Sequence, residues 1–261
     1  MARPRAIVLR APGTNCDEET AAAWERAGAI VETWHVGRLV ESPGSLDDFQ
    51  VLTIPGGFSY GDDLGAGRIL AARLGTVLGE SLRRFHDRGG LVLGICNGFQ
   101  VLVRAGLLPG KPSMGRATLA RNESARFESR WVRLSARPGL CPFLSDHSPA
   151  TIELPVAHGE GRFVPSSTED LAELDLTGQI VLQYADHQGR PTQVYPENPN
   201  GSPAAIAGLC DPTGRIFGLM PHPERFIDPW HHPRWTRRPG PAAESGEGMA
   251  IFTNAVRSLE A

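Results

Sequence analysis

One cysteine of this sequence stands between two glycines at the end of an apolar run. Residues 92–100 read Val-Leu-Gly-Ile-Cys-Asn-Gly-Phe-Gln, with Cys96 between Gly94 and Gly98. A strand that turns sharply into a helix needs small neighbours because the backbones crowd there, and this pattern is typical of a nucleophile elbow. The following helix would direct its positive dipole end at the sulfur, which favours a thiolate. Cys96 is therefore a candidate nucleophile, with a buried structural thiol as the alternative.

A second apolar run ends in a rigid turn that carries a histidine and a carboxylate. Residues 216–224 read Ile-Phe-Gly-Leu-Met-Pro-His-Pro-Glu. A cysteine nucleophile needs a group that takes and returns a proton, and an imidazole oriented by a carboxylate does this. We expect His222 and Glu224 to join Cys96 in space despite their distance in the chain. The alternative, a histidine that only caps a strand beside a solvated Glu224, is weakened by the elbow.

A glycine-rich loop after a third apolar run could meet the oxyanion of acyl chemistry. Residues 55–61 read Pro-Gly-Gly-Phe-Ser-Tyr-Gly, and glycines let backbone N–H groups approach a reacting atom. The N–H groups of Gly57 and Asn97 are the expected donors. A phosphate cradle is the competing function, but the loop lacks the Gly-Lys-Ser/Thr ending of a P-loop, and Asp62 and Asp63 would repel phosphate.

Alternating strand and helix patterns must position these residues. Apolar strand-like runs at 6–10, 29–36, 51–54 and 91–95 are separated by helical patterns at 17–27 and 64–87, and a helix is expected over 97–105. Such alternation predicts an α/β fold with a mostly parallel central sheet and helices on both faces. The second half has strand-like runs at 131–134, 151–157, 180–184, 204–209 and 216–220. We therefore expect a smaller β region flanking the same core.

Composition indicates a globular protein rather than a nucleic-acid or membrane protein. The 261 residues are 41% hydrophobic and 21% charged, which suits one domain over 1–261 better than two small ones. A formal charge of −3 does not favour binding to nucleic acid or to an anionic membrane, because both are negatively charged. The four cysteines are scattered and no run has the length of a membrane span, so we expect a cytoplasmic location.

Three motifs together resemble the class I glutamine amidotransferases. They are Gly-Ile-Cys-Asn-Gly-Phe-Gln at 94–100, Pro-Gly-Gly-Phe-Ser-Tyr-Gly-Asp at 55–62 and Met-Pro-His-Pro-Glu-Arg at 220–225. More narrowly, the chain is similar to the glutaminase subunits of phosphoribosylformylglycinamidine synthase, through segments at 12–17, 121–131, 155–163 and 198–202. The resemblance covers nearly the whole chain and implies the flavodoxin-like fold of that class.

The resemblance implies a reaction and partners. Cys96 would attack the side-chain amide of glutamine, His222 would exchange the proton, and Glu224 would orient His222. The thioester would hydrolyse to glutamate, and the ammonia would pass to a separate, ATP-dependent synthetase subunit in purine biosynthesis, with a small third subunit bridging the two. ATP and Mg are expected in that synthetase, with no metal or cofactor in this chain.

The resemblance also implies a surface that holds the α-amino and carboxylate groups of glutamine. It would comprise Gly56, Phe58, Gln100, His158 and Gly159.

Several residues stay outside this scheme. Cys16 precedes a helix but lacks the glycine pair, which favours a structural or partner-facing role. His231 and His232 have no further ligand at metal spacing and are expected to be solvated. Residues 227–248 form a longer and more aromatic loop than the family pattern leads us to expect, and Trp230 and Trp235 in it could pack on this domain or on a partner.

Rival functions remain at this point. A cysteine-elbow peptidase or stress chaperone typically lacks the His-Pro-Glu turn, and a catalytically silent regulatory subunit usually loses a member of the Cys-His-Glu set. Guanylate and carbamoyl-phosphate amidotransferases are disfavoured by the segments at 12–17 and 121–131.

Overall fold

A nine-stranded sheet forms the centre of the protein in the computed structural model, which describes residues 3–110, 117–137, 139–145, 150–237 and 244–260. Its strands, in spatial order, are β2 (Ile30–His35), β1 (Arg5–Arg10), β3 (Val51–Ile54), β4 (Leu91–Ile95), β11 (Ile216–Leu219), β10 (Ile206–Cys210), β9 (Ile180–Ala185), β6 (Glu128–Ala136) and β7 (Thr151–His158). Neighbours from β2 to β11 pair in parallel, and those from β11 to β7 pair antiparallel.

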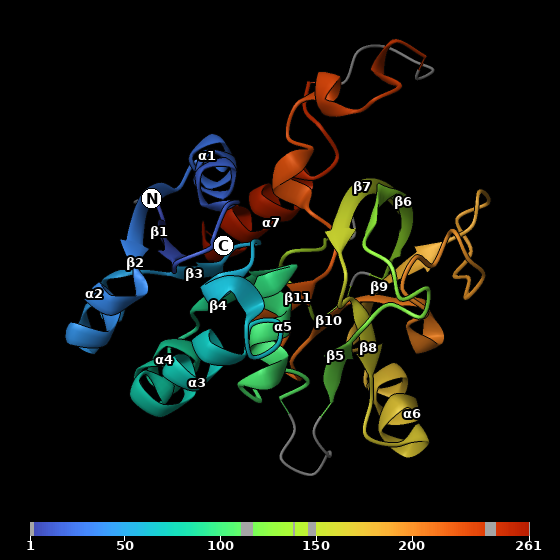
Figure 1. Ribbon diagram of the computed structural model, residues 1–261. Helices are drawn as coiled ribbons and strands as arrows, with labels where there is room; N and C mark the ends of the chain where they lie inside the picture. Colours follow the sequence, from blue (N-terminus) through green and yellow to red (C-terminus); the bar gives the residue numbers. More distant parts are fainter. Residues whose placement is uncertain (1–2, 111–116, 138, 146–149, 238–243, 261) are drawn as a thin grey trace.

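Helices cover both faces of the parallel half, as the sequence predicted (Figure 1). Helices α1 (Asp17–Ala27) and α7 (Met249–Glu260) pack together on one face, while α3 (Arg68–Val77), α4 (Gly79–Asp87) and α5 (Asn97–Arg104) gather on the other. The remaining α-helices are α2 (Val36–Glu41) and α6 (Thr168–Leu176). The single helix expected over 64–87 is two helices that meet at Leu78. None of the described helices is long and apolar enough to cross a membrane.

The β-rich second half extends the central sheet. Strands β10, β9, β6 and β7 continue it beyond β11, so the two halves share one core. The small flanking sheet consists of β5 (Thr118–Ala120) and β8 (Arg162–Val164). Short 3-10 helices punctuate the loops: η1 (Pro43–Asp48), η2 (Ser59–Asp62), η3 (Pro203–Ala205), η4 (Pro223–Arg225), η5 (Pro229–His231) and η6 (Trp235–Arg237).

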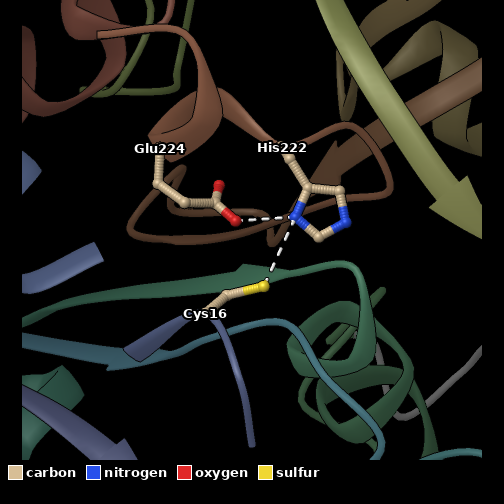
Figure 2. A group of neighbouring side chains, drawn as sticks. All are labelled: Cys16, His222 and Glu224. Carbon is tan, nitrogen blue, oxygen red and sulfur yellow. Dashed lines mark hydrogen bonds and ion pairs between the residues drawn. The ribbon is translucent and has the colours of Figure 1, made fainter. Parts of the chain in front are cut away.

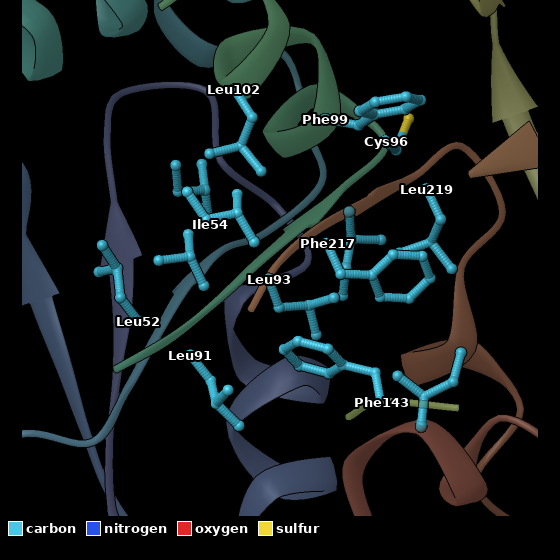
Figure 3. Packing of buried hydrophobic residues seen from close by; sticks show 14 of the residues in the cluster. Leu52, Ile54, Leu91, Leu93, Cys96, Phe99, Leu102, Phe143, Phe217 and Leu219 are labelled. Atoms are coloured by element: carbon cyan, nitrogen blue, oxygen red, sulfur yellow. The ribbon is translucent and has the colours of Figure 1, made fainter. Parts of the chain in front are cut away.

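The central strands are apolar throughout because both faces of the parallel sheet are covered. Every residue of β3, β4 and β11 is buried. The elbow helix α5 contributes the ring of Phe99 to this packing (Figure 3). Phe217 of β11 packs against Phe143, with ring centroids 5.4 Å apart. Each large apolar side chain buried in this way stabilises the fold by about 1.5–3 kcal/mol.

Strand register brings three loops to one edge of the sheet. Ile54 at the end of β3 is opposite Gly94 of β4, and Ile95 is opposite Leu219 at the end of β11. Because parallel strands end at the same edge, the loops that follow β3, β4 and β11 emerge side by side. Strand β1 lies next to β3, so the loop after β1 joins them.

Candidate active site

Cys96 occupies a strained turn between β4 and α5. Its φ is +51°, a left-handed conformation that non-glycine residues seldom adopt. The backbone N–H of Cys96 donates to the carbonyl of Leu219 at 2.8 Å, which ties the turn to β11. A Cβ atom on Gly98 would lie 1.9 Å from the carbonyl oxygen of Ile54, and one on Gly94 would lie 2.7 Å from that of Gly98. Both glycines are therefore needed where the elbow crosses the neighbouring strand.

His222 and Glu224 form a buried pair just beyond β11. The Nδ1 of His222 lies 2.6 Å from Oε1 of Glu224 (Figure 2), and the two residues are 2% and 1% exposed. The backbone N–H of His222 donates to the carbonyl of Pro155 in β7 at 2.8 Å. Burial opposes the charged imidazolium, yet the pKa of His222 lies well above its ordinary value because the Glu224 carboxylate and the Cys96 sulfur favour the charged form.

The glycine-rich loop after β3 lies against Cys16 and the ring of His222. A Cβ atom on Gly56 would lie 2.7 Å from Cε1 of His222. Gly57 has a φ of +138° and bridges to Thr14 in the loop after β1. The N–H of Asn97 belongs to the first turn of α5, where backbone donors have no partner within the helix. Gly57 in the loop after β3 and Asn97 at the start of α5 thus flank the cysteine. Their role as oxyanion donors stays a prediction.

A pocket of about 170 Å³ opens at this meeting point. It is lined by Asn15, Gly57, Phe58, Cys96, Phe127, Ala157, His222 and Arg225. Phe58 and Phe127 are 47% and 54% exposed, so two phenyl rings border the pocket on the solvent side. A thiol, an imidazole and a guanidinium therefore share a small cavity.

The predicted substrate-binding residues occupy two different places. Phe58 lines the pocket and Gly56 borders the His222 ring, whereas Gln100, His158 and Gly159 are not among the lining residues. The Nε2 of Gln100 donates to the carbonyl of Glu160 at 2.6 Å, and its Oε1 accepts from Nδ2 of Asn97 at 2.9 Å. Gln100 therefore braces the elbow helix against the 158–161 loop, and its role toward substrate remains a prediction.

His158 is buried behind the pocket in one tautomer. The Nδ2 of Asn122 donates to two backbone carbonyls, so its Oδ1 is the acceptor that faces Nδ1 of His158 at 3.1 Å. His158 consequently carries its proton on Nδ1, while its buried Nε2 has no hydrogen-bond partner in the described chain. Burial, reinforced by the charge of His222, lowers the pKa of His158 to about 3.

Two residues that the sequence did not assign to the site, Cys16 and Arg225, belong to it; for Cys16 a structural or partner-facing role was expected. The Sγ of Cys16 lies 4.0 Å from Nδ1 of His222, on the same side of the ring as Glu224 (Figure 2). The Nη2 of Arg225 donates to that sulfur at 3.0 Å. The available signal was the turn Pro-Gly-Thr-Asn-Cys after the first strand, but only the pairing of β1 with β3 brings this turn to the site.

The Cys16, His222 and Glu224 side chains also have the donor types of a metal site. One ligand atom from each lies within 4.8 Å of the others. However, the Arg225 guanidinium is directed at the sulfur, and Nδ1 of His222 is engaged with Glu224. A positive charge at this position disfavours a cation, so we interpret the group as a hydrogen-bonded cluster.

The loop predicted at 227–248 is partly anchored on the sheet, with residues 238–243 outside the described chain. His232 is buried, contrary to the expectation that it is solvated, because its ring packs edge-on against Trp131, with ring centroids 4.5 Å apart, and at a tilt against Phe226. His231 is exposed, as expected. Trp230 and Trp235 are 63% and 56% exposed, so neither is buried in this domain.

The parallel sheet and the cysteine elbow beside a His–Glu pair define the class of glutamine amidotransferases. A family described as the CobB/CobQ-like glutamine amidotransferase domain matches residues 3–258. The chain belongs to this family and, within it, to the PurQ subunits of phosphoribosylformylglycinamidine synthase. The expectation drawn from the motifs is therefore confirmed.

Individual relatives match over nearly their full length. The chain is 47% identical to "Phosphoribosylformylglycinamidine synthase subunit PurQ" of Dehalococcoides mccartyi, over 98% of each protein. It is 41% identical to the subunit of the same name from Archaeoglobus fulgidus, over 98% of this chain and 97% of that one. Among solved structures, "Structure of PurLQS from Thermotoga maritima" contains a chain with a TM-score of 0.74 and 30% identity, covering 99% of this chain and 100% of that chain.

Proposed function

We propose that this chain is the glutaminase subunit of phosphoribosylformylglycinamidine synthase. It hydrolyses glutamine to glutamate and ammonia and passes the ammonia to the ATP-dependent synthetase subunit. That subunit converts formylglycinamide ribonucleotide to formylglycinamidine ribonucleotide in purine biosynthesis. The observation that carries the proposal is the pocket in which Cys96 and the Glu224-paired His222 meet, in a chain of PurQ ancestry.

Each group in the pocket has a chemical task in this reaction. The Cys96 thiolate attacks the side-chain carbonyl carbon of glutamine, and the carbonyl oxygen gains a negative charge. The N–H groups of Gly57 and Asn97 stabilise this oxyanion by donating hydrogen bonds to it. Each such donor is worth about 3 kcal/mol of barrier. The His222 imidazolium gives its proton to the departing nitrogen, the C–N bond breaks, and ammonia leaves behind a γ-glutamyl thioester.

Water completes the cycle. Neutral His222 takes a proton from a water molecule, which attacks the thioester carbonyl and displaces the Cys96 sulfur as thiolate. Glutamate leaves, and His222 is again protonated. Glu224 keeps the ring oriented and stabilises the imidazolium throughout, which the raised pKa of His222 supports.

The relatives indicate how the chain works in the cell. A solved relative carries the name PurLQS, and we propose that this chain likewise assembles with a synthetase subunit and a small bridging subunit in the cytoplasm. ATP and Mg belong to the synthetase, consistent with the lack of a P-loop motif in this sequence. We treat 1–261 as a single amidotransferase domain that carries the 227–248 loop as an insertion.

The decisive experiment compares two nitrogen sources in the assembled complex. Cys96→Ala should abolish amidine formation from glutamine and leave its formation from ammonium salts at the wild-type rate, because only the glutaminase half needs the thiol. Loss of both activities would place Cys96 in folding or assembly rather than in chemistry. Retention of the glutamine reaction would remove Cys96 as the nucleophile.

A further inference from the structure

Cys16 touches two side chains that differ in charge. Its sulfur accepts a hydrogen bond from Nη2 of Arg225 at 3.0 Å and faces Nδ1 of His222 at 4.0 Å. The thiol in turn donates to Oδ1 of Asn15 at 3.2 Å. Cys16 is 0% exposed, and burial raises the pKa of its thiol although His222 opposes this. The sulfur is therefore a buried contact between Arg225 and the imidazole.

The placement of Arg225 is unexpected on electrostatic grounds. Glu224 has its second carboxylate oxygen, Oε2, buried and without a hydrogen-bond partner in the described chain. Arg225 is the next residue, yet within the described residues its ion pair is with Glu19 at 3.8 Å and not with Glu224. A guanidinium normally binds a buried carboxylate in preference to a thiol, since an unpaired buried carboxylate oxygen is costly. The guanidinium instead donates from Nη2 to the Cys16 sulfur.

We propose that Cys16 is a positioning residue that keeps the Arg225 guanidinium from hydrogen-bonding Glu224, so that the carboxylate hydrogen-bonds His222 and not Arg225. The inference rests on the glutaminase function proposed above. If Arg225 paired with Glu224, the positive charge of the guanidinium would offset the carboxylate charge. The guanidinium would also compete with His222 for the carboxylate oxygens. His222 would then lose both the charge that stabilises its imidazolium and the contact that orients its ring.

The groups that face His222 are few and come from four elements. Glu224 and Arg225 belong to η4, Cys16 precedes α1, Cys96 follows β4 and His158 ends β7. His158 stays neutral above about pH 3. The Glu224 carboxylate raises the pKa of His222, and the Cys96 and Cys16 sulfurs add to this effect. A guanidinium bound to Glu224 should therefore lower the pKa of His222.

The test is the pH profile of glutamine hydrolysis by the assembled complex, with Cys16→Ala, Cys16→Ser and a control, Cys141→Ala. Cys141 is a buried cysteine in another part of the core. The alkaline limb of kcat/KM reports the loss of the His222 proton. In Cys16→Ala this limb should move roughly 1 pH unit or more toward acid, as expected when an arginine neutralises the partner carboxylate. Cys16→Ser keeps an acceptor for Arg225 and should stay near the wild-type profile, as should the control.

A double variant separates this role from simple packing. Cys16→Ala/Arg225→Gln has no guanidinium to approach Glu224, so most of the shift of its alkaline limb should be reversed. The remainder reflects the lost contact of Cys16 with His222, which itself favours the imidazolium. Ammonia-dependent synthesis, measured on every variant, shows whether the complex is intact. The proposal would be overturned if the alkaline limb of Cys16→Ala lay at the wild-type pH. It would also be overturned if the double variant showed the full acid shift of Cys16→Ala. Absence of glutaminase activity in the wild-type complex would instead contradict the proposed function itself.

Discussion

The ring of His222 leaves no room for a side chain at Gly56. A Cβ atom at that position would lie 2.7 Å from Cε1 of His222 and 3.1 Å from the sulfur of Cys16. Gly56 does not have a left-handed backbone, so the glycine is required by space rather than by φ. The loop after β3 and the imidazole after β11 are thus fitted to each other across the sheet edge.

This fit predicts a selective loss of activity. Gly56→Ala should lower glutamine hydrolysis roughly 100-fold, because a displacement of about 1 Å of a catalytic group has that effect. Ammonia-dependent synthesis by the complex should be unchanged. Gly44→Ala is the matched control, since a Cβ there meets nothing within 4 Å. Full glutaminase activity in Gly56→Ala would show that His222 is not held as the structure indicates.

The two residues of the His–Glu pair should contribute unequally. His222→Ala removes the proton carrier and should slow glutamine hydrolysis roughly 1000-fold or more, whereas Glu224→Gln keeps a hydrogen-bonding side chain and should slow it less. Steady-state kinetics of the assembled complex measure both effects. Equal rates for the wild type and His222→Ala would exclude the pair from the chemistry.

His158 makes folding stability depend on pH with a definite sign. Its pKa of about 3 in the folded chain lies below the ordinary unfolded value near 6.5, so the unfolded state binds more protons as the pH falls. The stability that His158 contributes is present above about pH 6.5 and is lost toward pH 3. Between pH 7.5 and pH 5 this loss should be about 2 kcal/mol.

Urea unfolding at these two pH values measures the effect. In His158→Gln the free energy of unfolding should fall by about 2 kcal/mol less than in the wild type over this interval. The exposed His187 provides the control, and His187→Gln should keep the wild-type pH dependence. If the free energy of unfolding of His158→Gln depended on pH as strongly as that of the wild type, the pKa of His158 would not be lowered in the folded state.

Partner binding should control the rate at which this subunit hydrolyses glutamine. Glutamine hydrolysis by this subunit alone should be slow and should rise when the synthetase and the bridging subunit are added, since coupling between the two sites avoids wasted glutamine. Ammonia release measured with and without the partners gives the ratio directly. A rate that does not change on adding them would indicate a stand-alone hydrolase.

Local sequence patterns determined the elements and the residues that could do chemistry. The helix over Asp17–Ala27 and the strand over Val51–Ile54 have the bounds that the patterns predicted, because capping residues and apolar runs bounded by turns act within a few residues. The glycine pair around Cys96 could also be interpreted from the local sequence, because a crowded turn restricts which residues can be neighbours in the chain. The sequence alone also specified His222 and Glu224 as an orientable pair.

Strand order was decided only in three dimensions. Nothing in the pattern of residues 6–10 says that this strand lies beside β3, and that pairing is what brings Cys16 to within 4.0 Å of His222. The burial of His232 likewise depends on Trp131, about a hundred residues earlier in the chain. Such neighbours are selected by the packing of the whole core, whose contacts join segments far apart in sequence. The sequence therefore determined which side chains could act, and the tertiary structure decided which of them meet.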